Sequence, residues 1–208
     1  MPPAIPPRVA AILNPLGTSL RAVLELDVSG RSVVVIGCGP IGLFAVASTK
    51  ALGACQIIGL DICEERLVLA KRLGCDMTLN PRHADPARQI MEATDGVGAD
   101  AIVEASGNET ALEGALKFLR KGGWYALVGL PSGPVRLNVG PNVVFKEAMI
   151  IRVHGREMFR TWKRMKQLLA GGVLHLHPIA THEMPLEDYA ERLALLETGK
   201  GSKVILIP

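Results

Sequence analysis

The chain has 208 residues, a formal net charge of +3 and a composition that is 49% hydrophobic but only 4% aromatic. This length can bury a full core, as one large domain or as one domain with an appendage. The positive charge is small and dispersed, and no basic cluster is interleaved with aromatic residues, so the composition gives no basis for a nucleic-acid partner.

The N-terminus and the cysteines indicate where the protein resides. Residues 1–7 are rich in proline and lack the charge and apolar core of a signal peptide, and no apolar run is long enough to span a membrane. Cys38, Cys55, Cys63 and Cys75 form neither a CxxC pair nor a zinc-ligand spacing, so we expect reduced, packed cysteines. These features predict a soluble, cytoplasmic protein without a membrane partner.

Apolar residues at helical spacing between Val9 and Leu24 predict a helical lead-in, interrupted at Asn14-Pro15. We expect this lead-in to span residues 1–28 and the main domain to span residues 29–208. From Val33 onward strands and helices alternate. The elements expected in the first half are strand 33–36, helix 40–52, strand 56–61, helix 64–73 and a short strand at 77–79.

The second half repeats this plan. Its expected elements are helix 87–93, strand 101–104, helix 109–119, strand 124–128 after a Gly122-Gly123 stop, strand 148–153, helices 158–169 and 186–196, and a last strand at 204–207. Alternation of this kind implies a parallel sheet with helices on both faces. The sequence therefore predicts an α/β, doubly wound parallel six-stranded sheet, the Rossmann fold.

The most specific motif is a glycine turn that follows the first strand. Gly37 allows a tight turn, Gly39 lets the backbone approach a pyrophosphate, and Gly42 lets the following helix pack closely on the sheet. The N-terminus of that helix presents unpaired N–H groups to phosphates. Nineteen residues after Gly42, Asp61 ends the second strand, where its carboxylate can accept both hydroxyls of an adenosine ribose.

Asp61 also favours one dinucleotide over the other. A carboxylate there repels a 2′-phosphate, and residue 62 is Ile rather than Arg, so NAD is favoured over NADP. A methyltransferase also binds a ribose with an acid at this point, but its last two glycines are usually two residues apart rather than three.

Ligands of open parallel sheets bind beyond the C-terminal strand ends. We therefore expect residues 105–107, 129–131 and 154–155 to line the same crevice.

Several segments together resemble the zinc-type medium-chain dehydrogenases, over residues 5–207. The segments that carry the resemblance are Asn14-Pro15-Leu16-Gly17, Gly37-Cys38-Gly39-Pro40-Ile41-Gly42, residues 154–159, Thr161-Trp162, residues 178–182 and the closing 199–204. The segments at 155–159 and 178–182 point to one subgroup of the family. The resemblance implies hydride transfer from a secondary alcohol to NAD.

The resemblance also implies particular cofactor contacts. Ile41 would pack on the dinucleotide, Asp61 would hold the adenosine ribose, and Arg66 would lie against the adenine. The full expected set is Gly37, Gly39, Pro40, Ile41, Gly42, Asp61, Arg66, Val128, Gly129, Leu130, Val153 and His154, of which the last five flank the nicotinamide.

The resemblance implies that the zinc ligands and proton relay lie in an N-terminal domain, and we expect this sequence to begin after that domain. The family usually has an acidic residue where this chain has Asn14 and a His where it has Arg21. We therefore expect neither a catalytic nor a metal-binding residue in this chain, and zinc only in that other domain. A zinc set of His175, His177 and His182 with Glu183 is the alternative, weaker for want of a further Cys or acid at ligand spacing. The segment at residues 199–202 is not a phosphate-binding loop, because the sequence lacks the first glycine and the hydroxyl residue of that motif.

Three hypotheses follow for the chain as a whole. It is the NAD-binding part of such an oxidoreductase or of another polyol or alcohol dehydrogenase, or a stand-alone NAD-binding and oligomerisation module, or a truncated product or expressed domain. The apolar strand Val204–Ile207 would be a liability if its edge stayed uncovered, so we expect a homo-oligomer through that strand.

Overall fold

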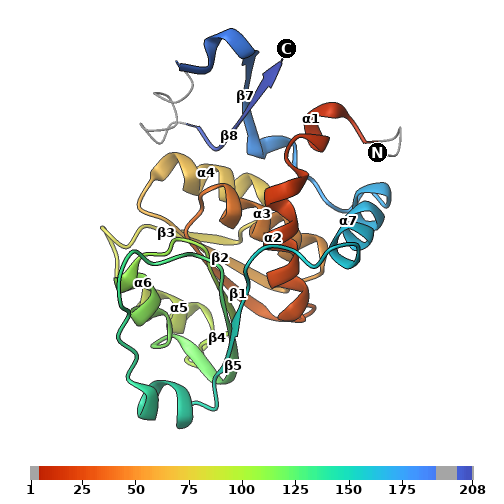
Figure 1. The fold of residues 1–208 in the computed structure, drawn as a ribbon. Helices are drawn as coiled ribbons and strands as arrows, with labels where there is room; N and C mark the ends of the chain where they lie inside the picture. The colour runs from red at the N-terminus through yellow and green to blue at the C-terminus, as the bar shows by residue number, and fades with distance from the viewer. Residues whose placement is uncertain (1–4, 191–200, 208) are drawn as a thin grey trace.

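The computed structural model describes residues 5–190 and 201–207 and has a six-stranded parallel sheet at its centre (Figure 1). The strand order is β3-β2-β1-β4-β5-β6, that of the doubly wound dinucleotide-binding fold. The strands are β1 (Ser32–Ile36), β2 (Gln56–Leu60), β3 (Met77–Leu79), β4 (Ala99–Glu104), β5 (Leu119–Leu127) and β6 (Met149–Arg152). The predicted fold class is confirmed.

Helices cover both faces of this sheet. One core contains buried residues of α2 (Leu13–Glu25), α3 (Pro40–Ala51), α4 (Glu64–Leu73) and α7 (Arg160–Ala170), and the other those of α5 (Pro86–Ala93) and α6 (Glu109–Ala115). Successive residues of β1 alternate between them, since Val33 and Val35 enter the first core and Val34 and Ile36 the second. A strand buried on both faces needs an unbroken apolar run, which β1 supplies.

The lead-in contributes directly to the first core. Leu13, Leu16 and Leu20 on α2 are fully buried with residues of α3. The predicted interruption at Asn14-Pro15 is wrong by a few residues. α1 (Pro7–Ala10) and α2 are separated at Ala11-Ile12, and Pro15 lies in the first turn of α2, where its missing N–H group costs no helical hydrogen bond.

The largest departure from the predicted elements lies between α6 and β5. The predicted helix 109–119 ends at Ala115, and β5 begins at Leu119, so Gly122-Gly123 lie inside a strand rather than stopping the helix. The register with β4 shifts between Ala99 and Ala101, which pair with Leu119 and Trp124 respectively. This irregularity accommodates residues 120–123.

A second, two-stranded sheet follows α7 and contains β7 (Ala180–Pro185) and β8 (Lys203–Ile207), paired in parallel. Within residues 5–190 and 201–207, the remaining elements are the short helices η1 (Gly140–Val144), η2 (His177–Ile179) and η3 (Leu186–Asp188). Arg8 links this sheet to the lead-in through an ion pair to Glu183 at 2.7 Å and a hydrogen bond to the carbonyl of Ala180.

The predicted helix 186–196 lies partly outside the described residues. No helix in the described part of the chain combines the length and apolar character needed to cross a lipid bilayer.

Candidate cofactor site

The three glycines between β1 and α3 occupy positions with different steric demands. Gly37 has a φ of +84°, and a Cβ atom there would lie 2.7 Å from the backbone nitrogen of Ser106. A Cβ atom at Gly42 would lie 1.7 Å from the carbonyl oxygen of Gly37. Gly39, in contrast, has no atom within 4 Å of its Cβ position. Packing therefore requires glycine at 37 and 42, while residue 39 faces open space.

The same turn forms the N-terminus of α3. Gly39 is the N-cap residue, Pro40 is the first helical residue, and no side chain of the described residues caps the first turn. The carbonyl of Ile41 accepts a hydrogen bond of 2.7 Å from the Ser19 hydroxyl, which fixes α3 against α2. The unpaired N–H groups of a helix start, together with its partial positive charge, favour an anion. Such a start beside an open glycine fits a phosphate group.

Asp61 lies at the carboxyl end of β2 beside this turn and is 8% exposed. One carboxylate oxygen accepts a hydrogen bond from the backbone N–H of Cys38 at 2.7 Å, and the other from that of Cys63 at 2.9 Å. The Arg66 guanidinium lies 3.9 Å from the same carboxylate. These contacts hold the Asp61 carboxylate in one orientation, and each oxygen keeps a lone pair that can accept a hydroxyl.

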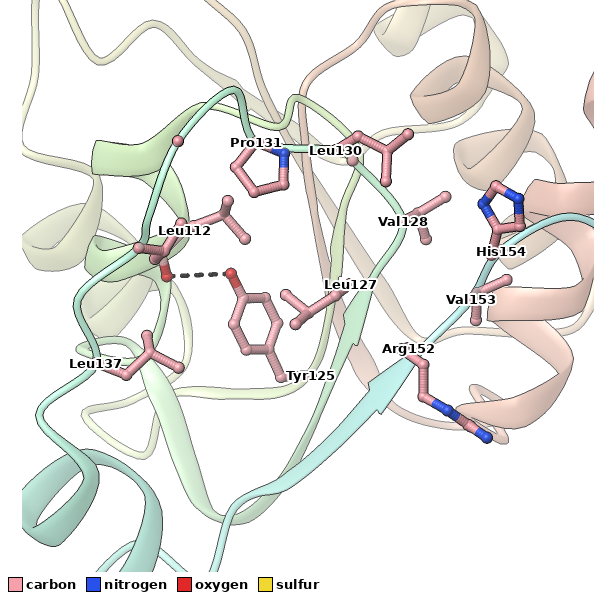
Figure 2. Close-up of a pocket in the computed structure, with 13 residues that line it drawn as sticks. Leu112, Tyr125, Leu127, Val128, Leu130, Pro131, Leu137, Arg152, Val153 and His154 are labelled. Atoms are coloured by element: carbon pink, nitrogen blue, oxygen red, sulfur yellow. Dashed lines mark hydrogen bonds between the residues drawn. The ribbon is translucent and has the colours of Figure 1, made fainter.

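The five residues predicted to flank the nicotinamide line one cavity of about 350 Å³ (Figure 2). Val128, Gly129 and Leu130 follow β5, and Val153 and His154 follow β6. Val153 is buried, whereas the Leu130 and His154 side chains are exposed. The inner wall is formed by Leu112, Tyr125, Leu127 and Leu137. The Tyr125 hydroxyl donates to the Leu112 carbonyl at 3.1 Å, and burial, with a smaller effect of Glu104, raises the pKa of Tyr125.

The turn after β4 lies between these two groups of residues. A Cβ atom at Gly37 would contact Ser106 on one side, and one at Gly107 would lie 2.5 Å from the carbonyl oxygen of Leu130 on the other. The glycine turn, residues 105–107 and residues 128–130 are thus contiguous along one edge of the sheet. Glu104 ends β4 beneath this edge, and the sequence did not predict it as a residue of the site. Its only sequence signal is an acid at the end of an apolar strand.

The segment after β6 is held by side chains of α2. The Arg21 guanidinium donates to the carbonyl of His154 at 3.4 Å, and that of Arg156 donates to the Asn14 side chain at 2.6 Å. Arg156 also stacks over the Trp162 ring, 5.4 Å from its centroid. Asn14 and Arg21, the two positions at which the sequence is expected to depart from the family, therefore both contact residues 154–156.

In residues 5–190 and 201–207, no group of three His, Cys, Asp or Glu side chains is placed to hold a metal ion. None of the four cysteines forms a disulfide; Cys38 and Cys75 are buried, but Cys55 is exposed. The expectation that all four are packed is therefore wrong for Cys55, which lies in the turn between α3 and β2.

Comparison with known proteins gives a consistent result. A family model described as zinc-binding dehydrogenase matches residues 40–171. L-Threonine 3-dehydrogenase from Bacillus subtilis is 41% identical over all of this chain, which spans 60% of that protein. Alcohol dehydrogenase from Thermus sp. ATN1 and 2R,3R-butanediol dehydrogenase from Bacillus subtilis share the fold with TM-scores of 0.90 and 0.91. They are 29% and 25% identical, and each match covers all of this chain and 61% and 60% of the other.

The strand order and the glycine turn define a Rossmann domain of the dehydrogenase class. The chain belongs to the zinc-binding dehydrogenase family. The resemblance to this family seen in the sequence is confirmed, and relatives named L-threonine 3-dehydrogenase match the whole length of the chain. The chain spans about 60% of the length of these curated relatives.

Proposed function

We propose that this chain binds NAD(H) and is the nucleotide-binding part of an oxidoreductase like L-threonine 3-dehydrogenase. The observation that carries the proposal is the open Gly39 position at the start of α3, next to the fixed carboxylate of Asp61. This arrangement offers an anion site and a hydroxyl acceptor side by side, as the phosphate and ribose of a dinucleotide require. The domain boundary near residue 28 belongs to the same proposal, with residues 29–208 forming the binding domain.

Each half of the site has a separate task in this proposal. The backbone N–H groups of Ile41 and Gly42 at the start of α3 bind the pyrophosphate. Asp61 accepts the ribose hydroxyls, and Arg66 lies against the adenine. Val128, Gly129 and Leu130, with Val153 and His154, hold the nicotinamide over the cavity that they line. NAD, when bound, supplies the hydride acceptor. The residues of this chain orient it and exclude water from its apolar side.

The described residues offer no donor set for zinc, so no catalytic step is assigned to a metal here. We propose that polarisation and deprotonation of the substrate hydroxyl depend on the part of the relatives that this chain does not span. The purified chain should therefore bind NAD but form no NADH from L-threonine. Threonine-dependent NADH formation by this chain alone would contradict that assignment.

Calorimetry with NAD and NADP tests the cofactor proposal. We expect the chain to bind NAD more tightly than NADP, and Asp61→Ala to weaken NAD binding about tenfold or more, because two hydroxyl contacts are lost. Glu92→Ala, on the exposed face of α5, is the control that removes a carboxylate elsewhere. Unchanged NAD affinity in the Asp61 variant would remove Asp61 from the site.

We further propose that the chain self-associates through β8. In the described residues β8 pairs only with β7, and the side chains of Leu206 and Ile207 are 37% and 49% exposed. An open apolar edge of this kind pairs readily with a second strand. Light scattering at micromolar concentration should show a dimer, and a charged substitution such as Leu206→Lys should dissociate it. A monodisperse monomer of the unsubstituted chain would overturn the proposal.

A further inference from the structure

Glu104 is a carboxylate in an unusual place. Its side chain has no exposed surface, and it ends β4, a central strand that pairs with both β1 and β5. A buried carboxylate is costly unless its charge is compensated by hydrogen bonds or a paired cation. Within residues 5–190 and 201–207 no Lys, Arg or His forms an ion pair with Glu104. The compensation must come from hydrogen bonds.

The donors to Glu104 all belong to the turn that follows it. One carboxylate oxygen accepts from the backbone N–H of Ser106 at 2.8 Å, from that of Gly107 at 3.1 Å and from the Ser106 hydroxyl. The other oxygen lies 3.2 Å from the N–H of Gly107. Hydrogen bonds to an ionised acceptor are stronger than neutral ones. Glu104 therefore fixes the conformation of residues 105–107.

The main chain of Glu104 fixes a second turn. Its carbonyl accepts hydrogen bonds from the N–H groups of Val128 and Gly129, both at 2.9 Å. A Cβ atom at Gly129 would lie 2.5 Å from the Glu104 carboxylate and 2.2 Å from the nitrogen of Gly107. Gly129 is thus pressed against both the carboxylate and the turn that the carboxylate organises. No residue other than glycine fits at position 129 without movement of these neighbours.

Glu104 consequently connects the two halves of the candidate site. On one side its turn contacts Gly37, and on the other it contacts Gly129 and Leu130. We propose that Glu104 is a positioning residue that sets where residues 128–130 hold the nicotinamide relative to the glycine turn. This inference rests on the proposed NAD binding. Glu104 acts through these two turns and does not itself contact the cofactor.

The isosteric substitution Glu104→Gln tests the assignment. The amide keeps one acceptor oxygen but turns an NH₂ group toward the N–H of Gly107, which displaces the turn without removing volume. We expect calorimetry to show NAD binding weakened about tenfold, because a buried donor is left facing a donor. Binding of 5′-AMP should change less than twofold, since AMP reaches only the Asp61 side. Glu92→Gln is the control, with both affinities unchanged.

The outcomes separate this inference from the proposed function. If the unsubstituted chain binds neither NAD nor 5′-AMP, the proposed function fails, and the role of Glu104 fails with it. If it binds both and Glu104→Gln leaves NAD affinity unchanged, or weakens NAD and AMP equally, only the positioning role is overturned. Should Glu104→Gln not fold, Ser106→Ala removes the hydroxyl donor alone. It should weaken NAD a few fold and leave AMP unaffected, and equal loss of both would again overturn the role.

Discussion

Gly42 lies so close to Gly37 that a Cβ atom at residue 42 would come within 1.7 Å of the Gly37 carbonyl oxygen. The same Cβ atom would lie 2.8 Å from the Gly37 carbonyl carbon, whereas the Val35 side chain would be 3.5 Å away, so the obstruction is backbone and cannot rotate away. The start of α3 and the end of β1 are therefore held at a distance that only glycine permits. Gly39, between them in sequence, has no such neighbour.

This difference predicts that Gly42→Ala destabilises the fold. Relief of the clash requires α3 to move away from β1, and forced repacking of this kind costs about 3 kcal/mol. Urea denaturation followed by circular dichroism measures the change. Gly114→Ala is the matched control, because Gly114 lies in α6 with no atom within 4 Å of its Cβ position. That variant should gain up to about 1 kcal/mol, and equal stability of the two variants would refute the steric argument.

Gly39→Ala should weaken NAD binding and leave the stability of the fold nearly unchanged. Its Cβ atom meets nothing in the protein, so the free energy of unfolding should change by less than about 1 kcal/mol, the usual effect at an N-cap. In the proposed complex, however, the same Cβ atom projects where the pyrophosphate approaches. We expect NAD binding to weaken at least about tenfold, a difference of about 1.4 kcal/mol, by calorimetry. Normal NAD affinity in this variant would place the phosphates elsewhere.

Asp100 provides a pH-dependent prediction at the opposite end of the sheet. Its carboxylate accepts from the N–H and hydroxyl of Ser32 at 2.8 and 2.9 Å and from the Arg120 guanidinium at 2.5 Å. Burial raises the pKa of Asp100, but these hydrogen bonds and the Arg120 charge outweigh burial and bring the pKa below its ordinary value of 3.8. The stabilisation is therefore complete above that value and is lost as the pH falls through the lower pKa of the folded state.

Asp100→Asn should accordingly lower the free energy of unfolding by about 1 to 2 kcal/mol at neutral pH. The gap between the two proteins should stay constant down to about pH 5 and close below about pH 4. Urea titrations across this range measure it. Asp27→Asn is the control, since the Asp27 side chain is 85% exposed and its contact with Arg31 is 3.6 Å long. A gap that persists at pH 2 would show that charge is not the cause.

The sequence predicts the first half of this fold well, for a local reason. An apolar run such as Val33–Ile36, a turn with three glycines and an acid at the next strand end each reflect constraints that act within a few residues. Helix α4 was predicted with the bounds that it has, Glu64–Leu73, because acidic residues begin it, Lys71 and Arg72 end it, and Gly74 caps it at a φ of +113°.

The parts that the sequence did not predict depend on distant neighbours. Gly122 and Gly123 lie inside β5 because the register with β4 shifts there, and that pairing is not encoded in residues near the glycines. Glu104 illustrates the same limit within the candidate site. An acid in isolation is expected at the surface, and its burial follows only once residues 105–107 and 128–129 fold around it.

The cysteines give a final prediction, in which alkylation reports opening of the glycine turn. Cys38 is fully buried between Gly37 and Gly39, and burial, with smaller effects of Cys75 and Asp61, raises the pKa of its thiol. Burial and then Asp76 raise the pKa of Cys75 to about 12. Because the thiolate is the reactive form, iodoacetamide at pH 8 should modify exposed Cys55 rapidly in the folded protein.

Cys38 and Cys75 should react only after unfolding, so their rates should rise together across a urea titration, as peptide mass spectrometry can measure. Cys55→Ser is the control, and should remove the rapid reaction without changing the slow ones. Saturating NAD should slow modification of Cys38, because a ligand that binds only the folded state stabilises it in proportion to RT ln(1 + [L]/Kd). Modification of Cys38 in the folded protein as fast as that of Cys55 would mean that the glycine turn opens without unfolding, contrary to the packing of Gly37 and Gly42.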